Sequence, residues 1–455
     1  MHRNGILQRV FACLLVIVLV VSGCAPKAEP ETVEKEVTRV VKETVIVPGT
    51  PEVVEKIVTA TVPPPPEPVT ITWTTWGGAI QAELYQEAIR QFHAKQDLVR
   101  VENINSPGLA DHLQKVQTMV AGGTPPDVIM IGGETVPAFA AEGIYQPLDP
   151  FIATDPNFDV HDYLPSTIDV MRYEGKIWAL PGGFNIGALY YNKALFDEAG
   201  LDYPTRDWDH NDLLEAAAAL TKREDGRVIQ YGYTNSPLNM WFFIWQNGGE
   251  VFDNDTNPSV MLLDQPAALE AVEWYFDLSL EHGVKPTLVE LMQSGGQQEL
   301  FASGQLAMLI DHRGATQVLN QITDFEWGIS ELPKGPEGRA VVFNWAGRGI
   351  AAGSKHPEAA WEFLKWLTGP EGVRIFIESG NGLPALYDLM DDPTLGIQQP
   401  FIDAVPYARP FFASPRWNDI LPVMLQYLQL MAIGEMEPRD AVPLMKQEVD
   451  AILSQ

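Results

Sequence analysis

Residues 121–143, AGGTPPDVIMIGGETVPAFAAEG, hold the pattern that decides the fold. A glycine pair ends one helical stretch, PPDVIMIGG is a short apolar strand entered through prolines, and TVPAFAAEG is helical up to Gly143. Upstream, the strand patterns VTITWTTW (69–76) and LVRVENI (98–104) flank a helical pattern at 81–95. This alternation of strand and helix predicts a mainly parallel α/β sheet covered by helices on both faces.

The alternation restarts further along the chain. Residues 177–200, IWALPGGFNIGALYYNKALFDEAG, predict a strand, a turn, a second strand and a helix that stops at glycine. Asp209 stands where the N-cap of the next helix is expected. Residues 341–369, VVFNWAGRGIAAGSKHPEAAWEFLKWLTG, again predict strand, turn, strand and helix, and the C-terminal third is predicted to be mostly helical. A second α/β unit is therefore expected.

The first residues have the layout of a secretory signal, with Arg3 and Arg9 before an apolar run at 11–21. That run is too short to span a bilayer of about 30 Å. The sequence VSGC, ending at Cys24, resembles the lipobox of bacterial lipoproteins, in which the cysteine is lipidated and becomes the new N-terminus. The alternative is a plain signal peptide with an incidental cysteine. Cys13 is the only other cysteine, so lipidation would leave the mature chain without a free thiol.

Residues 25–68 are rich in Val, Glu, Lys, Thr and Pro and contain no aromatic residue. VEKEVT at 33–38 recurs as VEKIVT at 54–59, and four prolines follow at 63–66. Such a composition cannot bury a core, so residues 24–68 are predicted to be a lipidated cysteine followed by a flexible tether. Short local strands or a coiled segment are the alternative for the valine-rich halves.

Composition and motifs exclude several classes of function. The formal net charge of −30 argues against nucleic acid as a partner, because nucleic acid needs a basic face. Two cysteines near the N-terminus leave no disulfide or cysteine-based zinc site for the body of the chain. The eight histidines are scattered, and no phosphate-binding, dinucleotide or nucleophile-elbow motif occurs. No metal and no cofactor are expected.

Four segments in order, AGGTPPDVIMIGG, ALYYNKALFDEAGL, FASGQLAMLIDHRGA and GRGIAAGSKHPEAAWEFLKWLTGPEG, resemble the family 1 extracellular solute-binding proteins, the maltose-binding-protein type of receptor for ABC importers. The resemblance implies a two-lobed periplasmic-binding-protein fold of type II with the ligand cleft between the lobes. The expected division is residues 1–23 signal peptide, 69–181 and 347–380 lobe one, 186–332 and 386–455 lobe two, with interlobe crossings at 182–185, 333–346 and 381–385.

A protein that binds a sugar needs flat aromatic side chains that stack on the apolar C–H faces of the sugar ring. It also needs planar polar groups, namely carboxylates, amides and guanidinium groups, that form hydrogen bonds with the sugar hydroxyls. Together with the resemblance, this requirement selects residues at strand ends and turns as ligand-binding candidates: Trp76, Asp127, Glu134, Asn185, Trp241, Asp311, Arg313, Trp345, Arg348, Arg409 and Trp417. Structural roles are the alternatives, namely packing for Trp76, local capping or pairing for Asp127, a helix start for Glu134 and a surface ion pair for Arg313. Relatives often carry a Trp near Asp311, and this chain has none between 311 and 321.

The resemblance implies a monomeric receptor that makes no bonds. It would bind a small solute such as a sugar or oligosaccharide and deliver it to ABC permease subunits. The lipid anchor would hold it on the outer face of the cell membrane, on the extracellular or periplasmic side. The alternatives are a polyol, a glycerol phosphate or another anionic ligand in the same fold, and, from another class, a surface carbohydrate-active enzyme or an adhesin.

Overall fold

The structure is a computed structural model that describes residues 36–45, 52–61, 67–235 and 240–455. The chain divides into two compact units, Met1–Glu67 and Pro68–Gln455, which are described separately. The signal peptide and Cys24 lie outside the described residues.

The first unit contains a two-stranded antiparallel sheet, formed by β1 (Glu36–Val45) and β2 (Glu52–Thr61). Their register runs without a break from Glu36 opposite Thr61 to Val45 opposite Glu52. The prediction of a flexible tether is therefore wrong for these two segments, where the alternative of local strands applies. Both strands are rich in β-branched Val and Thr, which favour extended backbone. The sequence VEKIVT, noted as a repeat, lies within β2.

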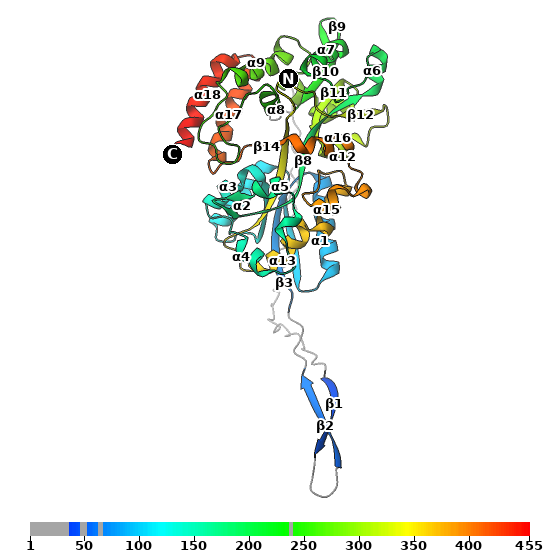
Figure 1. Cartoon of the computed structure of the whole chain (residues 1–455), viewed down its shortest axis with the longest axis vertical. Helices are drawn as coiled ribbons and strands as arrows, with labels where there is room; N and C mark the ends of the chain where they lie inside the picture. The colour runs from blue at the N-terminus through cyan, green and yellow to red at the C-terminus, as the bar shows by residue number, and fades with distance from the viewer. Residues whose placement is uncertain (1–35, 46–51, 62–66, 236–239) are drawn as a thin grey trace, which may run out of the picture. The chain divides into compact units, whose positions relative to one another are not determined.

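The second unit is built on a ten-stranded mixed sheet (Figure 1). Its main path is β4-β3-β5-β13-β8-β11-β10-β9, with β12 beside β8 and β14 beside β13. The bounds of these strands are β3 (Val69–Trp76), β4 (Val99–Ser106), β5 (Val128–Gly132), β8 (Leu180–Asn192), β9 (Lys222–Glu224), β10 (Arg227–Asn235), β11 (Leu306–His312), β12 (Trp327–Ser330), β13 (Val341–Ile350) and β14 (Ala408–Pro410). A separate small sheet pairs β6 (Arg172–Tyr173) with β7 (Lys176–Ile177).

Helices cover this sheet (Figure 1). In the part nearest the N-terminus they are α1 (Ala79–Lys95), α2 (Leu109–Ala121), α3 (Val136–Ala141), α4 (Asp149–Thr154) and α5 (Pro165–Asp169). They are followed by α6 (Lys193–Ala199), α7 (His210–Leu220), α8 (Trp241–Gln246), α9 (Pro266–Leu280), α10 (Leu288–Gln293), α11 (Gln297–Ala302) and α12 (Thr316–Leu319). The C-terminal group is α13 (Pro357–Thr368), α14 (Pro370–Glu378), α15 (Tyr387–Met390), α16 (Gln399–Ala404), α17 (Trp417–Ala432) and α18 (Pro438–Leu453).

The predicted helix start at Asp209 is confirmed by a capping box. The Asp209 side chain accepts hydrogen bonds from the amides of Asn211 and Asp212, and the Asp212 carboxylate accepts one from the Asp209 amide. The predicted parallel order is also present, since β3 pairs in parallel with β4 and β5, and β10 pairs in parallel with β11. Antiparallel strands β8 and β13 join these groups.

β8 and β13 are the two long strands at the centre of the sheet (Figure 1). Each was predicted as two strands around a turn, and each is one continuous strand. The glycines serve close packing here: a Cβ at Gly183 would lie 2.7 Å from the Leu383 carbonyl oxygen. The irregularity in β13 is a register shift between Trp345 and Gly347. The predicted crossings at 182–185 and 333–346 thus fall wholly or partly within paired strands.

The third predicted crossing, at 381–385, lies beside the first. Phe184 and Leu383 form an antiparallel bridge, with hydrogen bonds of 2.9 and 2.6 Å in the two directions. The predicted hinge segments therefore meet side by side at the middle of the sheet. The residue limits of the two lobes stay a prediction.

No helix within the described ranges is both long and apolar enough to cross a membrane. The same residues contain no group of three or more His, Cys, Asp or Glu side chains that could hold a metal ion.

Candidate functional site: an interlobe cleft

A cavity of about 630 Å³ opens between the two halves of the sheet. It is lined by strand ends and turns from both lobes, including the ends of β3 and β5, the middle of β8 and β13, and the end of β11. Seven of the predicted ligand-binding residues line it: Trp76, Glu134, Asn185, Asp311, Trp345, Arg348 and Trp417. Because these come from segments far apart in the chain, the fold alone brings them together.

Trp76 is the last residue of β3 and lies partly exposed at the cleft. Its carbonyl oxygen accepts a 2.8 Å hydrogen bond from the Tyr85 hydroxyl, and its ring centroid lies 5.3 Å from that of His112. Gly77 follows with a φ of 141°, a conformation that side chains rarely adopt. One ring is thus fixed in position with part of its surface open to the cavity.

Glu134 lies in the 3₁₀ turn η1 (Gly133–Thr135), directly after β5. Burial raises the pKa of its carboxyl from 4.5 to about 7. A Cβ at Gly132 would lie 2.1 Å from Glu134 Oε1, and one at Gly133 would lie 1.4 Å from Trp345 Nε1. Two glycines therefore allow the carboxylate and the indole to close onto the end of β5.

Trp345 and Trp417 are both only 5% exposed, so little of either ring is open to the cavity that they line. Trp345 packs on Phe343 at a centroid distance of 4.8 Å, and Trp417 packs on Phe412 at 4.7 Å. Within the described residues the indole nitrogen of Trp345 has no hydrogen-bond partner. Both rings form an aromatic wall of the cleft.

Asn185 and Asp311 are held from neighbouring segments. The Asn185 side-chain oxygen accepts a 3.2 Å hydrogen bond from the Gly314 amide. Asp311, at the end of β11, accepts side-chain hydrogen bonds from Gln298 at 2.9 Å and from Gln297 at 3.4 Å. The cleft thus presents oriented amide and carboxylate groups, which are suited to hydroxyl ligands.

Arg348 on β13 is 6% exposed and lines the same cavity. Its Nη1 makes one long hydrogen bond of 3.5 Å to the Ala346 carbonyl, and its Nε has no partner among the described residues. Burial lowers the pKa of the guanidinium, while the tyrosines at 85, 145 and 163 raise it. A Cβ at Gly182 would lie 2.2 Å from Nη1, so glycine makes room for the guanidinium.

Four predicted residues are placed elsewhere. Asp127 joins loops of lobe one: it accepts hydrogen bonds from the Thr72 amide at 2.8 Å and the Ser354 hydroxyl at 2.6 Å. Trp241 is 1% exposed and packs in the core beside Phe411. Neither lines the cavity, so neither is carried into the proposed set of ligand contacts.

Arg409 is also removed from the predicted site. Its guanidinium pairs with Glu250 through bonds of 3.0 and 2.8 Å and with Asp255 at 2.9 Å. It lies over the Trp245 ring at 4.5 Å. With its donors engaged by two carboxylates, Arg409 stabilises the packing of lobe two and does not line the cavity.

Arg313 does not line the cavity and lies beside the third predicted crossing. It is 3% exposed, and no carboxylate of the described residues lies within ion-pair distance of it. Its Nη1 donates to the carbonyls of Ile377 at 3.2 Å and Gly382 at 2.5 Å. Nη2 donates to Leu395 at 3.3 Å and Gly396 at 3.5 Å. The sequence alternative, a surface ion pair, is wrong as well.

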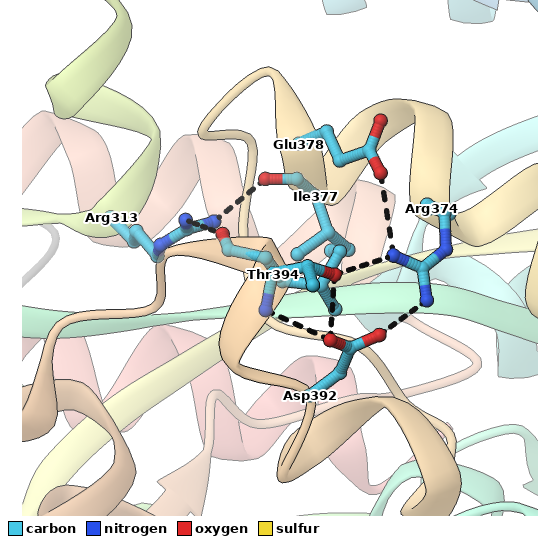
Figure 2. A network of polar contacts seen from close by, with 7 residues as sticks. Arg313, Arg374, Ile377, Glu378, Asp392 and Thr394 are labelled. Carbon is cyan, nitrogen blue, oxygen red and sulfur yellow. Dashed lines mark hydrogen bonds and ion pairs between the residues drawn. The ribbon is translucent and has the colours of Figure 1, made fainter.

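Figure 2 shows how Arg313 from η4 (Arg313–Ala315) reaches the end of α14 and the turn η5 (Pro393–Leu395). Arg374 continues the network with Asp392 and with Glu378 at 3.4 Å. The Thr394 hydroxyl, then the Arg374 guanidinium and the Thr394 amide, lower the pKa of Asp392 to about 2. These contacts tie η4 to the end of α14 and to the segment after the third predicted crossing.

Several lining residues were missed by the sequence analysis: Gln81, Tyr85, Gln297, His312, Asn344, Phe376, Asn381 and Phe411. Asn344 could have been found from the sequence, because it directly precedes the candidate Trp345. In the structure it pairs with Asn185 across β13 and β8. Asn381 lies within a predicted crossing. Of the others, His312 ends β11 and the rest lie on helices or loops, and only the tertiary fold defines how these segments approach the cleft.

Comparison with known proteins identifies the family. A family model described as bacterial extracellular solute-binding protein matches residues 74–374, which is more than half of the chain. The chain belongs to this family. A galactooligosaccharide-binding protein of Bacillus subtilis (strain 168) is 22% identical over 383 residues, covering 81% of this chain and 86% of the relative. A maltotriose-binding protein of Pyrococcus abyssi (strain GE5 / Orsay) is 23% identical over 332 residues, covering 69% and 66%.

The fold has solved counterparts. The substrate-binding protein Lmo0181 from Listeria monocytogenes, an ABC protein in complex with cycloalternan, superposes with a TM-score of 0.77 at 24% identity. The match covers 85% of this chain and 99% of that one. The expected two-lobed binding-protein fold is therefore confirmed, and the family is one of binding proteins.

Proposed function

We propose that this chain captures a sugar or oligosaccharide outside the cytoplasm and delivers it to the permease of an ABC importer. The observation that carries the proposal is the cleft of about 630 Å³, in which aromatic edges alternate with oriented carboxylate, amide and guanidinium groups. Relatives whose names state galactooligosaccharide and maltotriose binding support the choice of sugar. The chain makes and breaks no covalent bond, so the sugar is released unchanged.

Capture is proposed to proceed by hinge closure. The three predicted crossings are adjacent through the β8–β13 pairing and the Phe184–Leu383 bridge, which gives the lobes a common axis. A ligand that contacts both lobes favours the closed arrangement by its differential affinity for it. The closed form is then the state that the permease recognises.

The site residues proposed to contact ligand are those that line the cleft: Trp76, Glu134, Asn185, Asp311, Trp345, Arg348 and Trp417. Of these, Trp76 has the most open ring, since Trp345 and Trp417 are nearly buried. We therefore assign the main stacking contact to Trp76 and the aromatic wall to the other two.

A thermal-shift screen of the full chain against neutral sugars, acidic sugars, polyols and sugar phosphates tests the proposal. A ligand at 100 times its Kd should stabilise the protein by about 2.7 kcal/mol. Trp76→Ala should abolish the shift, whereas the matched control Trp366→Ala, a half-buried Trp on α13 outside the cleft, should keep it. No shift with any sugar, or hydrolysis of the sugar by the purified protein, would refute the receptor assignment.

We further propose that residues 1–23 are a lipoprotein signal peptide and that lipidated Cys24 anchors a monomeric receptor to the outer face of the membrane. The support is sequence alone, namely the basic start, the short apolar run and VSGC. Labelled palmitate should enter the wild-type chain and Cys13→Ala, but not Cys24→Ala. Equal labelling of all three variants would contradict lipidation at Cys24.

A further inference from the structure

The floor of the cleft contains a buried positive charge without an acidic partner. Arg348 forms no ion pair within 4 Å with any carboxylate in the described residues. Among the described residues, its one hydrogen-bond partner is the Ala346 carbonyl, at 3.5 Å. Buried guanidinium groups are normally paired, because removing an unpaired charge from water is costly.

The neighbouring residues restrict the position of the Arg348 guanidinium but leave its hydrogen-bond donors largely without acceptors. It lies against Gly182, where a Cβ would be 2.2 Å from Nη1 and 3.0 Å from Nη2. The Phe376 ring is on another side, with its centroid 5.7 Å from the guanidinium carbon. Gly182 and Phe376 also line the cavity, so Arg348 is pre-positioned at its wall. Pre-positioning reduces the entropy lost when a ligand group binds.

The partner that fits this group is a carboxylate. The five donors of a guanidinium form a planar fork that matches the two oxygens of a carboxylate. A neutral hydroxyl satisfies one donor and leaves the charge unpaired. The two acids in the cleft do not supply the partner: Asp311 is held by Gln297 and Gln298 on the lobe-two side, and Glu134 folds back over Gly132.

We propose that the solute is an acidic sugar, a uronic acid or an oligosaccharide containing one, whose carboxylate pairs with Arg348 in the cleft. The inference rests on the proposed function, since it names which class of sugar the cleft selects. Asp311, Asn185 and Glu134 then accept or donate hydrogen bonds at the sugar hydroxyls, and Trp76 covers one face of a ring.

The test compares matched pairs of probes by calorimetric titration of the full chain. The pairs are galacturonate with galactose, glucuronate with glucose, and trigalacturonate with galactotriose; glucose 6-phosphate is the test for another anion. The acidic probe of at least one pair should bind about ten- to a hundredfold more tightly than its neutral counterpart, as a hydrogen-bonded charge pair provides. Raising the salt concentration should weaken that probe more than the neutral one.

The variants assign the preference to one side chain. Arg348→Gln should bring the acidic and neutral probes to within about twofold of each other, while Arg348→Lys, which keeps the charge but not the fork, should retain an intermediate preference. Arg90→Gln removes the same charge from the exposed face of α1 and should leave both affinities unchanged. The circular dichroism of each variant shows that it is folded.

Each remaining outcome overturns the inference. Equal binding of acidic and neutral sugars by the wild type, or a stronger preference for the phosphate than for uronates, refutes the carboxylate assignment and leaves the receptor function standing. An acidic preference that survives Arg348→Gln places the carboxylate elsewhere. If no probe of any class binds, the proposed function fails together with this inference.

Discussion

Arg313 and Arg348 are two buried arginines whose surroundings differ in one respect. Each is nearly inaccessible, at 3% and 6% exposed, and neither is paired with an acid of the described residues. Arg313 donates to four backbone carbonyls and to the Gln398 side chain, whereas Arg348 has a single long bond. The hinge region thus holds a satisfied cation, and the cleft floor holds one that is open to a ligand.

The difference follows from the backbone around each residue. Arg313 faces the C-terminal end of α14 and the turn η5, where backbone carbonyls point toward its guanidinium and no helix continues. Arg348 projects from the middle of β13, between β5 and β8, where the sheet ladder uses the neighbouring carbonyls. Arg313, beside the ends of segments, therefore stabilises the fold. Arg348, within a continuous strand, is left available to a ligand.

The largest expected effect separates these two roles. Arg313→Met should lower the free energy of unfolding by about 4 kcal/mol, because several buried carbonyls lose their donor at once. Urea denaturation monitored by tryptophan fluorescence measures the loss. Arg374→Met is the matched control in the same network; its side chain is 35% exposed, so solvent screens its pairs and the loss should be much smaller. Equal losses in both variants would show that Arg313 does not brace the crossing.

A second test concerns Glu134, the acidic side chain that follows β5 and lines the cleft. The pKa of Glu134 is raised to about 7, so between about pH 4.5 and 7 the folded protein holds a proton that the unfolded chain has released. The free energy of unfolding should therefore fall as the pH rises through this window, by about 2 kcal/mol after allowance for partial exposure. Denaturation midpoints of wild type and Glu134→Gln at pH 5 and 7.5 measure it. Glu134→Gln should not show this fall in the free energy of unfolding. The same pH profile in the wild type and in Glu134→Gln would mean that the Glu134 carboxyl is solvated and that its pKa is not raised.

The next effect has the opposite sign to that of Arg313. Arg348→Met should leave the ligand-free stability unchanged or raise it by about 1 kcal/mol, because an unpaired buried charge is replaced by an apolar side chain of similar length. The measurement is the same urea denaturation, performed without ligand. A loss comparable to that of Arg313→Met would mean that the cleft arginine is structurally satisfied, and the contrast between the two regions would collapse.

Much of this fold could be predicted from local sequence. The capping box at Asp209 and the parallel order of β3, β4 and β5 follow from patterns of a few residues. The continuity of β8 and β13 could not be predicted, because a glycine pair favours a turn locally and only the approach of Leu383 explains Gly183. The paired strands β1 and β2 were missed for a different reason. Their composition cannot bury a core, but it contains enough β-branched residues for the two segments to pair as strands.

The site was predictable in part for the same reason. Residues at the ends or centres of strands, such as Trp76, Asn185 and Trp345, line the cleft as strand position suggests. The three arginines were not distinguishable, because Arg313, Arg348 and Arg409 were all chosen as ligand-binding candidates without knowledge of their acceptors. Their roles depend on which acceptors arrive from distant segments: carbonyls for Arg313, carboxylates for Arg409 and neither for Arg348.

The smallest expected effect lies where the hinge region meets the rim of the cleft. Gln317 on α12 donates to the Ser379 hydroxyl at 3.1 Å and accepts a long hydrogen bond of 3.4 Å from Gln81 on α1. By the predicted lobe limits the second bond joins the two lobes, so we expect it to break when the cleft opens. Gln81→Ala should therefore speed ligand release about two- to threefold, equivalent to about 0.5 kcal/mol, with stability unchanged. Stopped-flow dissociation of the sugar found in the screen measures it, and Gln91→Ala, elsewhere on α1, is the control. A release rate equal to that of the control would mean that closure is governed by the Arg313 brace and the ligand alone, with no contribution from the rim.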